Sequence, residues 1–129
     1  MKNKELANKY LSKAYQDIKA CKVLMNDKDI ATEIIGFHCQ QAAEKIIKAI
    51  LAFLLINFIK THDLTTLLHL LEKEKIKLPE KFCCLDDLTP FAVEYRYDFY
   101  LGFQDEFETT EYIVILEDFY NWADKLINN

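Results

Sequence analysis

The stretch FHCQQAAEKIIKAILAFLLI, residues 37–56, decides the fold of this 129-residue chain. Apolar side chains recur in it at steps of three and four residues, while the polar side chains up to Lys48 gather on the opposite arc. This spacing predicts an amphipathic helix, which we expect to run from about Ile30 to Phe58. The polar arc consists of Gln41, Glu44, Lys45 and Lys48.

The far end of this predicted helix is apolar on every side. From Leu51 onward, apolar residues such as Leu55 and Ile56 replace the polar arc, and a helix that is apolar all round must be covered all round. A membrane-spanning helix needs about 20 apolar residues, far more than the uninterrupted run at 49–56, so we predict no membrane span. The cover must come from the other helices or from a second protomer. We predict a homodimer with Leu51, Leu55 and Ile56 in its interface.

The rest of the chain also predicts helices. Only two glycines and two prolines are present, so helix breakers are scarce. We therefore predict an all-α protein with one domain, residues 1–129, folded as an up-and-down bundle of four long helices plus a short helix. The other helices are expected at about 4–25, from 64 to before Pro79 with Thr61 as N-cap, at about 81–88, at about 91–100 after Thr89-Pro90, and at about 111–127.

Composition restricts the function and the location. Sixteen basic residues against 21 acidic ones give a net charge of −5, which opposes strong nonspecific binding of nucleic acid but allows a local basic patch. The four cysteines lack the spacing of a zinc site. The first twenty residues carry charges throughout, unlike a secretory signal. We expect reduced thiols, a cytoplasmic location, and neither a metal nor a cofactor.

Three motifs resemble the HEPN domain family (higher eukaryotes and prokaryotes nucleotide-binding). They are FHCQQAAEKIIKA at 37–49, KTHDL at 60–64, and LTPF at 88–91 followed by Arg96-Tyr97. The resemblance implies a helical bundle that dimerises and that works near RNA or nucleotides. Many stand-alone members of this family are encoded beside a minimal nucleotidyltransferase, with which they act as a toxin–antitoxin-like pair.

The chain departs from this family at the ribonuclease motif. Members that are metal-independent ribonucleases carry an arginine, four to six other residues and then a histidine, with one copy from each protomer at the dimer cleft. After Arg96, the corresponding positions hold Leu101, Gly102 and Phe103, none of which can transfer a proton. Phe103 also stands where one subgroup has a tyrosine that receives nucleotides. We therefore expect the usual active site to be absent, and we assign no catalytic residue.

Arg96 is the only arginine of the chain. Its guanidinium can clamp a phosphate through two parallel hydrogen bonds, which a lysine cannot do. The alternative is an ion pair with Glu94 or Asp98 that supports the bundle. The neighbouring Tyr97 can likewise stack on a base or belong to the core.

Further candidates lie on the central helix and just after it. Gln41, Glu44 and Lys48 line the cleft with Arg96 in one interpretation, whereas in the other Glu44 and Lys48 form a solvated pair four residues apart. His62 either supports the next helix start, by capping it or by bonding to Asp63, or transfers protons. His38 is either a partly buried structural histidine or a member of the same groove.

Three functions are consistent with these residues. The leading prediction is a helical dimer that binds a nucleotide, RNA or a partner protein and is paired with a minimal nucleotidyltransferase in a toxin–antitoxin-like system. The first alternative is a divergent metal-independent ribonuclease that uses Arg96 with His62 or His38. The second alternative is a purely structural helical dimer.

Overall fold

The structure, a computed structural model, describes residues 2–92 and 108–129. All secondary structure in these ranges is helical, which confirms the all-α prediction. Two predicted site residues, Arg96 and Tyr97, lie outside the described residues. The elements are α1 (Lys2–Leu24), α2 (Thr32–Phe53), α3 (Leu64–Lys73), the 3₁₀ helix η1 (Glu80–Phe91) and α6 (Thr109–Asn128).

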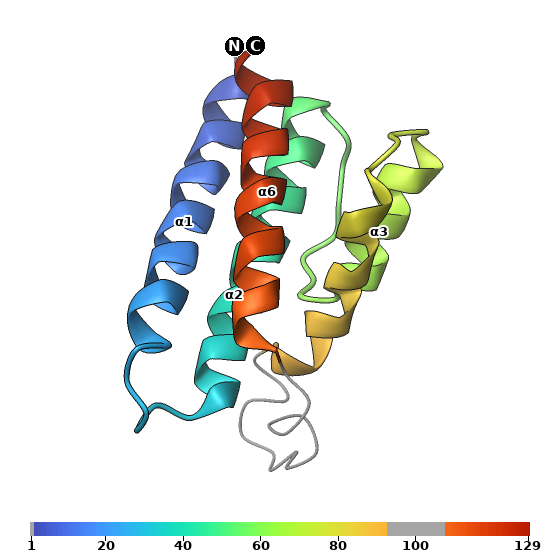
Figure 1. Ribbon diagram of the computed structural model, residues 1–129. Coiled ribbons are helices and arrows are strands. Elements are labelled where there is room, and N and C mark those ends of the chain that lie inside the picture. Colours follow the sequence, from blue (N-terminus) through green and yellow to red (C-terminus); the bar gives the residue numbers. More distant parts are fainter. Residues whose placement is uncertain (1, 93–107) are drawn as a thin grey trace.

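Helix α2 is the centre of the bundle. It contacts α1, α3, η1 and α6, and α1 runs antiparallel to α2 and α6, so that the two chain ends lie side by side (Figure 1). Helix α3 and η1 pack beside this three-helix layer (Figure 1). No helix of the described residues has both the length and the apolar character needed to cross a bilayer.

Small side chains allow α1 and α2 to approach each other closely. Along α1 the buried residues recur at three- and four-residue steps, as expected for one face of a helix. Burial of these side chains supplies the largest favourable term in folding. The buried apolar residues of α1 and of the facing part of α2 are Ala7, Leu11, Ala14, Ile18, Cys21, Ile35, Cys39, Ala42, Ala43, Ile46 and Ala49.

Helix α2 ends in a Schellman motif at Phe53. The N–H of Leu55 donates to the carbonyl of Ala52 at 3.1 Å, and the N–H of Ile56 donates to that of Leu51 at 2.9 Å. Leu55 has a φ of 58°, the left-handed conformation that this motif requires and that glycine usually supplies. The capping bonds satisfy the last carbonyls of the helix and turn the chain away.

This helix end corrects the sequence-based account of the dimer surface. The helix does not continue to Phe58, and Leu51 is fully buried in the core of its own protomer. Leu51 therefore exposes no surface within this chain, and its place in an interface stays a prediction. Leu55 is 75% exposed and Ile56 is partly buried. The dimer itself stays a prediction.

Two predicted helix starts also differ from the structure. Asp63, rather than Thr61, caps α3, because its carboxylate accepts the N–H of Thr65 at 3.0 Å. The hydroxyl of Thr61 accepts the N–H of Asp63 at 3.1 Å, so it bonds to the capping residue and not to the first turn of the helix. Thr89 and Pro90 lie inside η1 instead of opening a new helix, and residues 93–100 of that expected helix lie outside the described ranges.

Gly36 leaves room for the ring of Phe91 where η1 meets α2. A Cβ added at Gly36 would overlap Cδ1 of Phe91 and lie 2.7 Å from Cγ and Cε1. We expect Gly36→Ala to lower the free energy of unfolding by about 1–3 kcal/mol through overpacking, although alanine favours a helix by about 1 kcal/mol over glycine. Urea unfolding measures the change. A variant with Phe91→Leu added should recover part of the loss, and a more stable Gly36→Ala protein would contradict the contact.

Candidate functional site

A buried charge network on α2 brings together three of the predicted site residues. The Glu44 side chain is only 5% exposed, although it ends in a carboxylate that forms an ion pair with Lys48. It accepts Lys48 Nζ on Oε2 at 2.9 Å and Gln40 Nε2 on Oε1 at 3.0 Å. His62 Nδ1 lies 2.9 Å from the same Oε1. The network therefore joins α2 to the loop that precedes α3.

The spacing of the α2 residues explains why they meet. Gln40, Glu44 and Lys48 are four residues apart and lie above one another on one helix face. Gln40 Nε2 also donates to the backbone carbonyl of His62 at 2.9 Å, and Gln41 Nε2 donates to Oε1 of Gln40 at 2.7 Å. Gln40 thus fixes the 54–63 segment over α2, and this segment covers side chains that the sequence places on a polar arc.

This cover overturns the interpretation of Glu44 and Lys48 as a solvated pair. Both are buried, and the Lys48 ammonium lies 5.9 Å from the centroid of the Phe58 ring, within cation–π range. Gln40 was missed as a site residue. The sequence did contain a signal for it, because Gln40 lies four residues before Glu44 and eight before Lys48, on the same face of the helix.

The pKa of Glu44 reflects opposing influences. Burial alone would raise it, because a carboxylate loses hydration in the core. The hydrogen bonds from Lys48, His62 and Gln40, with the positive charge of Lys48, outweigh burial and hold the pKa of Glu44 below its ordinary value of 4.5. Glu44 is therefore ionised at neutral pH.

His62 is the exposed end of this network. Its side chain is 45% exposed, and Nε2 has no hydrogen-bond partner within the part of the chain that the structure describes. Because ionised Glu44 can only accept hydrogen bonds, Nδ1 of His62 carries the proton of this bond, and Nε2 is the ring nitrogen left outside the network. The predicted bond between His62 and Asp63 is replaced by the bond to Glu44, and Asp63 caps α3 instead.

His38 belongs to a separate cluster between α1 and α2. His38 Nδ1 lies 3.1 Å from Oδ1 of Asp17, and Lys45 Nζ lies 2.6 Å from Oδ2. The three side chains are mostly buried. The cluster ties α1 to α2, so His38 is a partly buried histidine with a carboxylate partner, apart from the Glu44 network.

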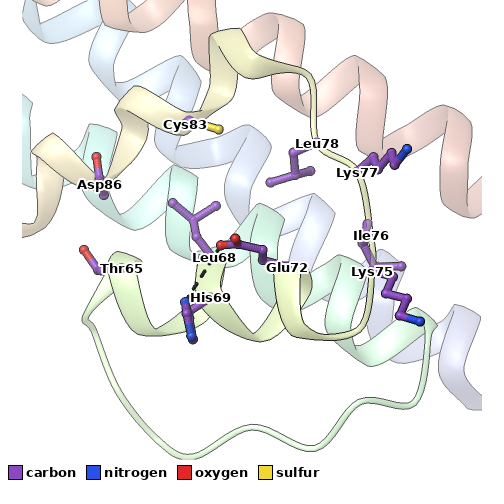
Figure 2. A pocket seen from close by; sticks show the side chains of 10 residues that line it. All are labelled: Thr65, Leu68, His69, Glu72, Lys75, Ile76, Lys77, Leu78, Cys83 and Asp86. Atoms are coloured by element: carbon purple, nitrogen blue, oxygen red, sulfur yellow. Dashed lines mark ion pairs between the residues drawn. The ribbon is translucent and has the colours of Figure 1, made fainter.

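A hollow between α3 and η1 lies apart from these residues. Its volume is about 730 Å³, and Leu68, Ile76 and Leu78 supply its apolar wall (Figure 2). His69 and Glu72 at its rim are 3.8 Å apart and both largely exposed, as expected for a solvated pair. None of the predicted site residues that the structure describes lines this hollow. Among the described residues, no three histidine, cysteine or acidic side chains gather where a metal could bind.

The lowered pKa of Glu44 predicts an acid-sensitive contribution to stability. A carboxyl whose pKa is lower in the folded state stabilises the fold above its unfolded pKa, and this stabilisation is lost as the pH falls through the folded pKa. We expect the stability difference between the wild type and Glu44→Gln to be full at pH 7 and to shrink below about pH 4. Urea unfolding at several pH values measures it. A Glu44 difference that grows in acid would refute the sign.

A family model covers these elements. The HEPN domain model matches residues 7–126, which span the Glu44 network and nearly the whole chain. The chain belongs to the HEPN domain family, as the resemblance of its motifs predicted. Searches of curated proteins and of solved structures found no match.

Proposed function

We propose that this protein is a HEPN-type binding module for RNA or a nucleotide. In this proposal Arg96 clamps a phosphate, and the Glu44 network presents His62 beside it. The protein acts as a cytoplasmic homodimer paired with a minimal nucleotidyltransferase in a toxin–antitoxin-like system. Binding without the usual cleavage follows from the sequence, which has no histidine at the family's position after Arg96.

The observation that carries the proposal is the buried Glu44 network. A buried ion pair is weak evidence for stability, since well-packed apolar residues often serve as well. Here the pair holds a half-exposed imidazole in one orientation through a bond of 2.9 Å. A titratable group fixed by a buried charge partner marks a candidate functional site. A phosphate or ribose hydroxyl could bond to Nε2 of His62.

Fluorescence anisotropy with a labelled 20-nucleotide single-stranded RNA, and with a labelled adenine nucleotide, tests the proposal. We expect Arg96→Ala to weaken binding at least tenfold, in line with the loss of a charged hydrogen-bonding partner. Arg96→Lys should be intermediate, because lysine keeps the charge but cannot form the two parallel bonds. If wild-type protein binds neither probe at 150 mM salt, the binding function is wrong.

The partner and the dimer need separate measurements. Sedimentation should give two copies per particle, and Leu55→Asp should shift the protein to one copy without unfolding it, because Leu55 is exposed. Capture from the source cells should recover a nucleotidyltransferase. A single-copy wild type would remove the dimer, and capture without any nucleotidyltransferase would remove the pairing.

One observation favours a second function, a divergent ribonuclease. Ionised Glu44 orients His62 as a carboxylate orients the base of a catalytic dyad, leaving Nε2 free to take a proton. Nε2 would take the proton of a ribose 2′-hydroxyl, whose oxygen would attack the adjacent phosphorus. The 5′ oxygen would leave with a proton from water, giving a 2′,3′-cyclic phosphate. Metal-free cleavage that is lost in His62→Ala and kept in His38→Ala would establish this function; inert wild-type protein would exclude it.

A further inference from the structure

Helix α1 has a charge opposite to that of the whole chain. It contains six lysines and two acidic residues, a net charge of +4, whereas the protein has a net charge of −5. Such an asymmetry typically marks a surface for an anionic partner. The lysines are Lys2, Lys4, Lys9, Lys13, Lys19 and Lys22, and the acidic residues are Glu5 and Asp17.

The lysines of α1 face solvent, whereas one of its two acidic residues is largely buried. All five lysines from Lys4 to Lys22 are exposed. Asp17 is largely buried against His38 and Lys45, so Glu5 is the one exposed carboxylate that α1 itself contributes. The five exposed residues are Lys4, Lys9, Lys13, Lys19 and Lys22.

Two of these lysines are paired and three are available. Lys22 pairs with Glu117 of α6, and Lys9 lies 4.0 Å from Glu5. Lys4, Lys13 and Lys19 have no carboxylate partner within the described ranges. At about 100° per residue, Lys4 and Lys19 lie within about 60° of each other, on the side of α1 that also carries Tyr15, whereas Lys13 lies on the side opposite to Lys4.

The length and the aromatic content of this face suit a single strand. From Lys4 to Lys22 the helix rises about 27 Å, at about 1.5 Å per residue. Tyr15 lies between them, is 45% exposed, and packs one side of its ring near Tyr120 of α6, with 5.8 Å between the ring centroids. Lys19 Nζ lies 5.4 Å from the Tyr15 ring centroid. Stacking of bases on aromatic rings beside cations is typical of single-strand binding.

Helix α1 lacks the free apolar face that binding to a membrane surface requires. Interfacial helices bury a free apolar face in the lipid. The apolar stripe of α1 is already buried in the bundle, as Leu11, Ala14 and Ile18 show. The exposed lysines therefore favour RNA over a lipid surface.

We propose that the exposed face of α1 binds the phosphate backbone of single-stranded RNA, with Tyr15 stacking on a base. This inference rests on the proposed function, RNA binding, and adds a further binding surface to it. In the proposed function Arg96 binds one phosphate, and α1 would hold a further length of the strand through its lysines.

The salt dependence of RNA binding tests this surface. For single strands, the slope of log affinity against log salt changes by about 0.7 for each phosphate contact. Lys4→Ala/Lys19→Ala should therefore reduce the slope by about 1.4 with a labelled 20-nucleotide RNA. The matched control is Lys73→Ala/Lys75→Ala, which removes the same charge from exposed positions elsewhere and should leave most of the slope intact.

Further variants test the stacking and separate the outcomes. Tyr15→Ala should weaken binding about tenfold, and Tyr15→Phe should restore it. Equal slopes for the two double variants would overturn the α1 surface while leaving the Arg96 result standing. Wild-type protein that binds phosphatidylserine vesicles but not RNA would overturn both proposals.

Discussion

Glu44→Ala is expected to lower the free energy of unfolding by about 3–5 kcal/mol, the range found when one partner of a buried ion pair is removed. The loss leaves the ammonium of Lys48 buried without its carboxylate. It also removes the acceptor of Gln40 and of His62 Nδ1. Urea or thermal unfolding of the two proteins at pH 7 measures the change.

The chain contains a matched control for this prediction. Glu5 and Lys9 have the same order and spacing as Glu44 and Lys48, but both side chains are largely exposed. Glu5→Ala should cost no more than about 0.5 kcal/mol. Glu44→Leu/Lys48→Met should be more stable than Glu44→Ala, because no buried charge is left unpaired. Similar costs for Glu44→Ala and Glu5→Ala would mean that the network is solvated.

The long helices could be predicted because periodicity reports which face is buried. The end of α2 could not be predicted, since Leu55 adopts the left-handed conformation that is usually marked by glycine. The apolar run simply continues past Phe53, where the helix stops. At the start of α3, two candidate capping residues two positions apart, Thr61 and Asp63, were available, and only tertiary structure selects between them.

Sequence reasoning predicted which residues belong to the candidate site better than it predicted how they are arranged. The spacing of Glu44 and Lys48 is visible in the sequence, but their burial depends on the 54–63 segment folding back over α2. The bond from His62 to Glu44 joins residues 18 apart, and no local pattern specifies it. Arg96, Tyr97, the dimer and the nucleotidyltransferase stay predictions.

Phe119→Ala is the second change with a large expected effect, a loss of about 3–5 kcal/mol of unfolding free energy. Phe119 is fully buried on α6. Its ring centroid lies 4.7 Å from that of Phe82 on η1 and 6.3 Å from that of Trp122. Truncation would leave a cavity and remove the Phe82–Phe119 contact between η1 and α6, leaving the Phe82–Trp122 contact, 6.2 Å between centroids, to join the same two elements.

An exposed position on the same helix separates packing from any general effect on α6. Val114 is exposed, so Val114→Ala should change stability by less than about 0.5 kcal/mol. Phe119→Leu should lose less than Phe119→Ala, because leucine fills most of the space. A Phe119→Ala protein as stable as Val114→Ala would show that the cluster of rings does not hold η1 against α6.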